Sequence, residues 1–186
     1  MAAPAGTGPV GPFPPGVDTP EAREEYDKVR RRVLWSLPSG LYVLGSRAGG
    51  RRNLMTVSWA TQVAVEPKLL GVGVERSALT HDLIAQGGSF TLSTVAREDR
   101  PLVRRFTKPV EHDPAAGTLA GVPFHDGPTG APVPDQAVAW VACRVRTPVD
   151  CGSHTFFVGE VVGCGFQRPE GSQVLRMEDT RMSYGG

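Results

Sequence analysis

Hydrophobic and polar residues alternate most regularly between Asn53 and Pro67. One side of this stretch carries large apolar side chains: Met55, Val57, Trp59, Val63 and Val65. The other side carries small or polar ones: Thr56, Ser58, Ala60 and Gln62. A period of two is typical of a β-strand. We therefore predict a long strand whose apolar face packs into a core. Its hydroxyl-bearing face either meets solvent or lets a flat ligand approach the backbone.

A helical pattern precedes this strand. Thr19 suits the N-cap, Pro20 the first helical position and Glu21 the acidic first turn. Apolar residues then recur at helical spacing: Ala22, Tyr26, Val29 and Val33. We predict a helix from about 20 to 36, with its basic end as a solvated face. Residues 1–18 are rich in Pro, Gly and Ala, which predicts a disordered tail ahead of one domain spanning 19–186.

Further strands are predicted at 41–44, 70–74 and 90–95, and two longer ones at 139–147 and 156–166. The second of these contains Gly71 and Gly73, which would let a bulky group approach or would mark a bulge. Asp99 could cap a short helix. Residues 107–136 are rich in turn-forming residues, which predicts a long excursion loop. Many strands, few helices and glycines within strands favour a small closed or split β-barrel.

The segment 76–80, RSALT, lies where a strand leads into a helix. Ser77 or Thr80 could cap this helix, which we expect to end at Gly87-Gly88. Free amides, the positive end of the helix dipole, Arg76 and two hydroxyls could together bind a phosphate. A simple cap is the commoner role of such residues.

Composition excludes several classes of function. The chain has 186 residues, 40% of them hydrophobic, and a net charge of +1, which gives no field for nucleic acid or an anionic membrane. Because no apolar run is long enough for a membrane span and no signal peptide is present, we expect a cytoplasmic protein. Cys143, Cys151 and Cys164 form no close pair, and we expect reduced, mostly core thiols. The histidines lack metal-ligand spacing, so no metal is expected.

His154 follows the turn residues Gly152-Ser153 and opens a strand. It is either a strand-edge residue or a ligand contact. The sequence contains no Ser/His/Asp order, carboxylate pair, dinucleotide fingerprint or P-loop. The sequence therefore shows no arrangement of catalytic residues that is typical of a hydrolase.

From about residue 33 to 186, the chain resembles the flavin reductase-like family of FMN-binding split barrels. The resemblance rests on the order and spacing of eight segments: LPSGLYVLGS (37–46), NLMTVSWATQV (53–63), EPKLLGVGV (66–74), RSALT (76–80), GGSFTLSTV (87–95), GVPFHDGPTGAPV (121–133), GSHTFFVGEVV (152–162) and YGG (184–186). It implies a mainly β, Greek-key type split barrel with a few short flanking helices. It also implies a homodimer with the flavin near the dimer interface.

The resemblance further implies a flavin reductase that uses NADH or NADPH to reduce FMN, or FAD, and that can supply reduced flavin to a partner monooxygenase. The implied cofactor-binding residues are Asn53, Thr56, Ser58, Trp59, Thr61, Arg76, Ser77 and Thr80. His154 is expected to position the nicotinamide. Many relatives have Gly-Asp-His at 152–154, where this chain has Ser153. Two alternatives stay open: a flavin-binding or electron-transfer module not reduced by a nicotinamide, and a structural barrel without cofactor.

Overall fold

The computed structural model describes residues 11–180 and Met182. The chain forms two compact units: a smaller one that joins the N-terminal segment through Pro38 with the C-terminal end from Met182, and a larger one, Ser39–Arg181. The proposed domain start at residue 19 stays a prediction. No helix of the described residues is long and apolar enough to cross a membrane.

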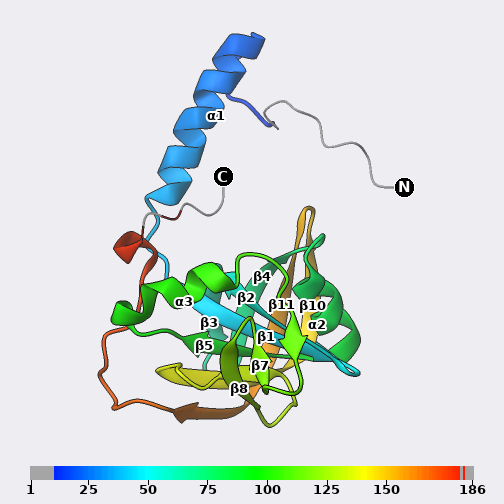
Figure 1. Ribbon diagram of the computed structural model, residues 1–186. Coiled ribbons are helices and arrows are strands. Elements are labelled where there is room, and N and C mark those ends of the chain that lie inside the picture. The colour runs from blue at the N-terminus through cyan, green and yellow to red at the C-terminus, as the bar shows by residue number, and fades with distance from the viewer. Residues whose placement is uncertain (1–10, 181, 183–186) are drawn as a thin grey trace. The chain divides into compact units, whose positions relative to one another are not determined.

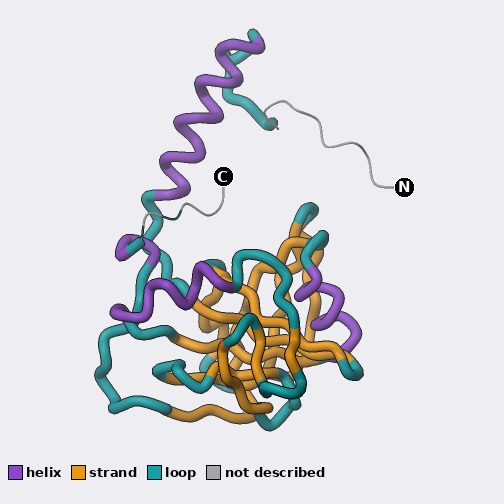
Figure 2. The backbone as a smooth tube through the Cα atoms, viewed as in Figure 1, coloured by secondary structure: helices purple, strands orange, loops and turns teal. Residues whose placement is uncertain are grey.

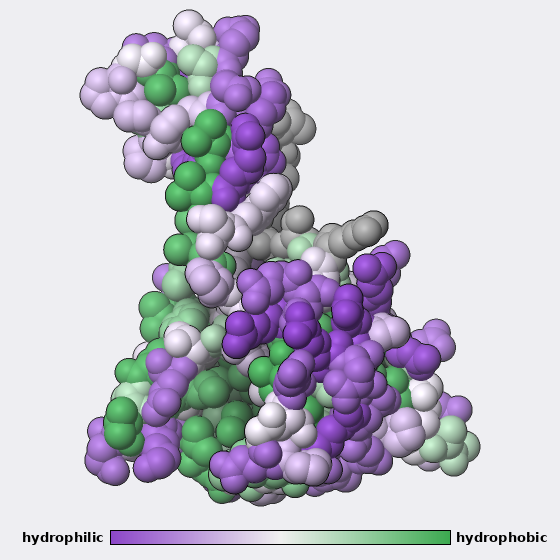
Figure 3. Space-filling model, turned by 90° about the vertical axis from the view of Figure 1, so that its left-hand side faces the viewer, coloured by the Kyte–Doolittle hydropathy of each residue, from purple (hydrophilic) through white to green (hydrophobic). Residues whose placement is uncertain are grey.

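The N-terminal unit is built on helix α1 (Pro20–Trp35), within one residue of the predicted bounds. The Thr19 hydroxyl accepts a hydrogen bond from the Ala22 amide at 3.2 Å, which is the predicted cap. Phe13, which belongs to the predicted tail, packs edge-on against Tyr26 of α1 with ring centroids 6.2 Å apart. Residues 1–10 of the predicted tail lie outside the described residues. Hydrophobic patches run along the helix beside hydrophilic ones (Figure 3). The exposed apolar side chains include Val29 and Val33.

The larger unit contains a seven-stranded sheet in the order β2-β1-β5-β10-β11-β4-β3 (Figure 1). Neighbouring strands are antiparallel throughout. The strands are β1 (Tyr42–Ala48), β2 (Arg51–Val57), β3 (Ala60–Ala64), β4 (Leu69–Glu75), β5 (Ser89–Thr94), β10 (Ala139–Cys151) and β11 (His154–Phe166).

The connection between the two edge strands shows that this sheet is rolled. β2 and β3 lie at opposite ends of the strand order, yet only residues 58 and 59 separate them in the chain. A flat seven-stranded sheet would place its edges about 29 Å apart, whereas such a short link spans about 10 Å. The sheet must therefore curve until its edges approach, and Figure 2 shows that its strands are curved and cross one another. Because β2 and β3 do not pair, the barrel stays split between them, and the predicted fold class is confirmed.

This link also corrects the long strand predicted at 53–67. Met55 and Val57 contact the main core as expected, but the chain breaks at Ser58-Trp59 and restarts as a strand of the opposite edge. Trp59, Val63 and Val65 are consequently exposed. Thr56 and Ser58 are instead buried. The core on the apolar side contains Leu44, Val57, Val72, Val74, Ile84, Phe90, Leu92, Cys143 and Phe157.

Short helices flank the barrel: α2 (Leu79–Gly87), the 3-10 turn η1 (Arg97–Asp99), α3 (Arg100–Arg105) and the 3-10 turn η2 (Met177–Asp179). Asp99 occupies the N-cap of α3 but makes no side-chain cap hydrogen bond. The predicted loop at 107–136 is wrong, because this segment folds into a four-stranded sheet. Its strands are β6 (His112–Asp113), β7 (Thr118–Leu119), β8 (Val122–Asp126) and β9 (Pro132–Pro134). β6, β7 and β9 have only two or three residues each, so turn residues dominate the composition of the segment.

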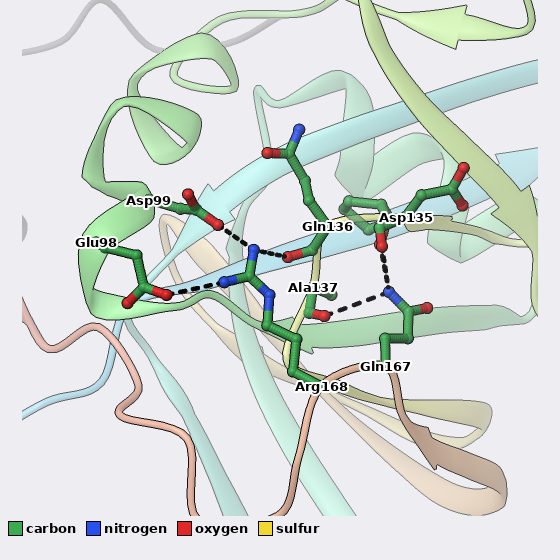
Figure 4. Close-up of polar contacts among 8 residues, drawn as sticks. Glu98, Asp99, Asp135, Gln136, Ala137, Gln167 and Arg168 are labelled. Atoms are coloured by element: carbon green, nitrogen blue, oxygen red, sulfur yellow. Dashed lines mark hydrogen bonds and ion pairs between the residues drawn. The ribbon is translucent and has the colours of Figure 1, made fainter.

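The segment that follows β11 is fixed by two polar side chains (Figure 4). The Arg168 guanidinium binds Glu98 at 2.9 Å and also binds Asp99 and the carbonyl of Gln136. The Gln167 amide donates to the carbonyls of Pro134, Asp135 and Ala137. Asp99 therefore binds an arginine distant in sequence where a helix cap was expected.

The cysteines are free, but they differ in burial. Cys143 lies in the main core, whereas Cys151 and Cys164 are exposed. The expectation of mostly core thiols is thus wrong for two of the three. Burial raises the pKa of the Cys143 thiol to about 12.

Candidate functional site

Aromatic side chains lie together where β3, β4 and β11 meet. The Gly73 amide donates to the Trp59 carbonyl at 2.8 Å, and Gly73 lies opposite Phe156 in the β4–β11 register. The Trp59 and His154 rings have centroids 4.8 Å apart and planes at 53°. Trp59 is 44% exposed and His154 is half-buried, so their rings form part of the surface.

One of the two glycines of β4 makes room for an aromatic side chain. A Cβ at Gly71 would lie 2.1 Å from Phe156 Cζ, so the Phe156 ring could not keep its position beside a larger residue. A Cβ at Gly73 would lie 3.4 Å from the Trp59 side chain, which is an ordinary van der Waals contact. The β4–β11 register is regular, without a bulge. At Gly71, the bulky group that the glycine pattern indicated is therefore the protein's own Phe156 ring.

The turn from β4 into α2 carries Arg76 and Ser77. The N-cap of α2 is Ala78, which makes no side-chain cap hydrogen bond, so neither Ser77 nor Thr80 is the cap we expected. Ser77 Oγ instead donates to Glu75 Oε1 at 2.9 Å. Because the first amides of a helix lack intrahelical acceptors, this uncapped end retains partial positive charge. Together with Arg76, it gives the turn the character of an anion site.

The tip of the β10–β11 hairpin lies against this turn. The Arg76 amide donates to the Ser153 carbonyl at 3.0 Å, and the Arg76 guanidinium pairs with Asp150 at 2.7 Å. Ser153 Oγ hydrogen-bonds His154 Nδ1 at 2.9 Å, and His154 is the register partner of Glu75. The aromatic surface and the anion-binding turn are therefore adjacent. They could bind a planar ring and an attached anionic group together.

A second group of sequence-predicted residues is buried and holds elements together. Asn53 Nδ2 donates to Thr80 Oγ1 at 2.8 Å, and Asn53 Oδ1 accepts from the Val110 amide at 3.1 Å. Thr56 Oγ1 donates to the Val103 carbonyl of α3. Asn53 is 2%, Thr56 4% and Thr80 0% exposed. Their polar groups are thus engaged within the protein.

The eight predicted cofactor residues and His154 therefore fall into two sets. Five lie on or beside the exposed region: Trp59, Thr61, Arg76, Ser77 and His154. Four are buried: Asn53, Thr56, Ser58 and Thr80. Thr61 belongs to β3 and lies opposite Gly71 in the β3–β4 register.

Sequence reasoning missed several neighbours of the exposed set. Asp150 pairs with Arg76, and Phe156 packs over Gly71. His81 Nε2 hydrogen-bonds Thr155 Oγ1 at 2.8 Å. Of these, only Asp150 had a recognisable pattern, since an aspartate two residues before a glycine often forms a turn. The described residues contain no group of three His, Cys, Asp or Glu that could hold a metal.

Comparisons with known proteins identify the family and the fold. A family model described as a flavin reductase like domain matches residues 34–185. A curated relative, the putative diflavin flavoprotein A 3 of Nostoc sp., is 29% identical over 136 residues, which cover 70% of this chain and 23% of the relative. The chain spans about a quarter of the length of such diflavin relatives.

Two solved structures resemble the chain more completely. The NADH:FAD oxidoreductase SgcE6 of Streptomyces globisporus is 26% identical with a TM-score of 0.70, covering 82% of this chain and 88% of its own. The styrene monooxygenase flavin reductase of Pseudomonas putida S12 is 27% identical with a TM-score of 0.65, covering 79% of this chain and 90% of its own. Both similarities extend over most of the fold.

Proposed function

The chain belongs to the flavin reductase like domain family, and from that premise we propose that it is a flavin reductase, which transfers a hydride from NADH or NADPH to FMN or FAD. The observation that carries the proposal is the juxtaposition of the Trp59–His154 ring surface with the Arg76 turn. This arrangement suits a ligand with a planar ring at one end and a phosphate at the other.

The donors in the turn fit a flavin phosphate. Arg76 supplies a permanent positive charge, and the uncapped start of α2 supplies backbone amides. Ser77 adds a hydroxyl beside them. We assign the phosphate to these groups. Asn53, Thr56 and Thr80 act behind them by fixing β2, α2 and α3 to one another.

The aromatic surface fits the ring system. Trp59 and Thr61 border it from the 58–61 segment, and His154 from β11. Ser58 directly precedes Trp59 in the chain and is buried. The flavin, when bound, supplies the hydride acceptor, so the protein needs no general base of its own.

The residues of the site then have to align the hydride donor and exclude water. We assign alignment of the nicotinamide to His154. Its Nδ1 is hydrogen-bonded to Ser153 Oγ. This hydrogen bond fixes the orientation of the ring and leaves Nε2 on the side away from the serine. Ser153 thus replaces the aspartate of many relatives as a neutral partner of the histidine.

We further propose that the protein works as a cytoplasmic homodimer that passes reduced flavin to a monooxygenase. The exposed apolar residues Val63 (44%) and Val65 (73%) on and beside edge strand β3 favour burial against a second copy. The name of the structural relative from Pseudomonas putida supports a monooxygenase partner. Sedimentation of flavin-loaded protein tests the dimer, and a mass near 20 kDa, the single-chain value, would contradict it.

A flavin-binding or electron-transfer module is the second candidate, favoured by Ser153 in the place of the family's aspartate. Oxidation of NADH or NADPH in the presence of added FMN or FAD separates the two functions. Turnover supports the reductase, whereas flavin binding without turnover supports the module. A protein that binds neither flavin would be a structural barrel and would overturn both.

A further inference from the structure

Both side-chain donors of the anion-binding turn are already paired with carboxylates. The Arg76 guanidinium binds Asp150 Oδ2 at 2.7 Å. The Ser77 hydroxyl binds Glu75 Oε1 at 2.9 Å. A phosphate that approaches these donors therefore meets two negative charges as well as one positive charge.

The Arg76–Asp150 pair is not needed to hold the turn and the hairpin together. The Arg76 amide already donates to the Ser153 carbonyl, and β4 pairs with β11 up to His154. The side chains of Arg76 and Asp150 are 49% and 67% exposed, and such pairs add little to folding stability. Exchange of Asp150 for another anion at Arg76 would therefore cost the fold little stability.

Asp150 is held in place independently of Arg76. Its Oδ1 accepts a hydrogen bond from the Gly152 amide at 2.8 Å, which fixes the carboxylate at the hairpin tip. The other oxygen, Oδ2, faces Arg76. The carboxylate is consequently a fixed negative charge beside the arginine.

We propose that Asp150, assisted by Glu75, lowers the affinity of this turn for the flavin phosphate and so keeps the flavin exchangeable. This inference rests on the proposed function. Asp150 competes with the phosphate for the guanidinium and repels it, because like charges within a few ångströms disfavour one another. Asp150 acts through Arg76 and is a positioning residue. The flavin then behaves as a substrate that leaves after reduction and not as a resident group.

The test compares Asp150→Asn with the wild type in titrations with FMN and with riboflavin, which lacks the phosphate. Asparagine has the same shape and keeps an Oδ1 acceptor for the Gly152 amide, so the turn is preserved. We expect the Kd for FMN to fall about two- to fivefold, the range of a surface ion pair. The Kd for riboflavin should not change. The gain should shrink at high salt, since screening weakens exposed charges.

Two further variants complete the design. Glu75→Gln should lower the ratio of the Kd for FMN to the Kd for riboflavin, as Asp150→Asn does, because Glu75 accepts a hydrogen bond from Ser77. Glu160→Gln is the matched control, because Glu160 pairs with Arg146 on the same β10–β11 ribbon, away from the hairpin tip. It should leave both dissociation constants unchanged.

If the ratio of the Kd for FMN to the Kd for riboflavin is unchanged in both Asp150→Asn and Glu75→Gln, the inference is overturned. The proposed function stays intact in that case. Weaker FMN binding by Asp150→Asn would also overturn it, since Asp150 would then hold Arg76 in its binding position. If the wild type bound neither flavin, the proposed function would fail and the inference with it.

Discussion

The imidazole of His154 lies against the indole of Trp59, although the two residues come from opposite sides of β4 in the sheet. Strand β4 lies between them: the Gly73 amide donates to the Trp59 carbonyl at 2.8 Å, and Glu75 is the register partner of His154. The middle strand therefore holds both sides of the ring surface of the proposed site.

Replacement of His154 by alanine should slow reduction by NADH or NADPH while sparing flavin binding. Only the alignment of the hydride donor is lost, so the rate of the reductive half-reaction should fall under single-turnover conditions. The flavin Kd is the control. Ser153→Asp, which restores the residue of many relatives, should keep or raise this rate. A wild-type rate in His154→Ala would remove the histidine from the site.

Arg76→Ala should weaken the binding of FMN about tenfold and should leave the binding of riboflavin nearly unchanged. The loss of one charge-assisted hydrogen bond to the phosphate accounts for this difference. Equilibrium titrations of both ligands measure it. Arg144→Ala, on β10, removes an exposed arginine from the same sheet and serves as the control. Equal weakening of FMN and riboflavin by Arg76→Ala would place the phosphate elsewhere.

Thr80→Val should reduce the free energy of unfolding by about 1 to 3 kcal/mol, because the Asn53 amide loses its buried acceptor. Any effect on FMN and riboflavin should be equal, since Thr80 is fully buried. Urea denaturation and the two titrations measure these quantities. A loss of affinity for FMN without a loss of affinity for riboflavin would instead make Thr80 a phosphate ligand.

Thiol reagents should modify two cysteines rapidly in the native protein and the third only on unfolding. Cys151 and Cys164 are exposed, whereas burial shields Cys143 and raises the pKa of its thiol to about 12, which suppresses the reactive thiolate. Cys143→Ala should therefore leave the native reaction unchanged. Three rapidly reacting thiols in folded protein would contradict the buried position.

Asp126→Asn should lower the melting temperature at neutral pH, and the difference should vanish in acid. Arg52 donates to both carboxylate oxygens at 3.0 and 2.7 Å, and this contact lowers the pKa of Asp126 below its ordinary value. A carboxylate with a depressed folded-state pKa stabilises the fold above its unfolded pKa, near 4, and the stabilisation disappears as the pH falls through the folded value. Because Asp126 is partly exposed, the contribution should be below about 1 kcal/mol. A difference that grew in acid would contradict the assignment.

Patterns local in sequence predicted the elements well. The α1 cap at Thr19, the end of α2 at Gly88 and the alternation within the strands each depend on residues a few positions apart. The split barrel was anticipated from strand number and glycines. The break at Ser58-Trp59 could not be predicted. The alternation of apolar and polar residues continues through it, although the chain passes there from one edge of the sheet to the other.

The site was only partly predictable for a similar reason. Arg76, Ser77, Trp59 and His154 were found, and the structure brings them to neighbouring positions. The burial of Asn53 and Thr80 depends on α2 packing against β2, a long-range contact that no local pattern encodes. The small sheet at 112–134 was missed because β6, β7 and β9 have only two or three residues each, and because β8, with five residues, contains a proline and two polar residues.

The β10–β11 ribbon has one further property. β10 pairs with β5 only through Ala139–Arg144, and the register between β10 and β11 shifts near Cys143 and again near Val145. Beyond Arg144, β11 is the only strand among the described residues that pairs with β10. On the other side of the ribbon, β11 pairs with β4 up to His154, and the Arg76 amide donates to the Ser153 carbonyl, so the far end of the ribbon is tied to the anion-binding turn. Amide hydrogen exchange at 147–153 would therefore report ligand occupancy at that turn without any optical property of the ligand.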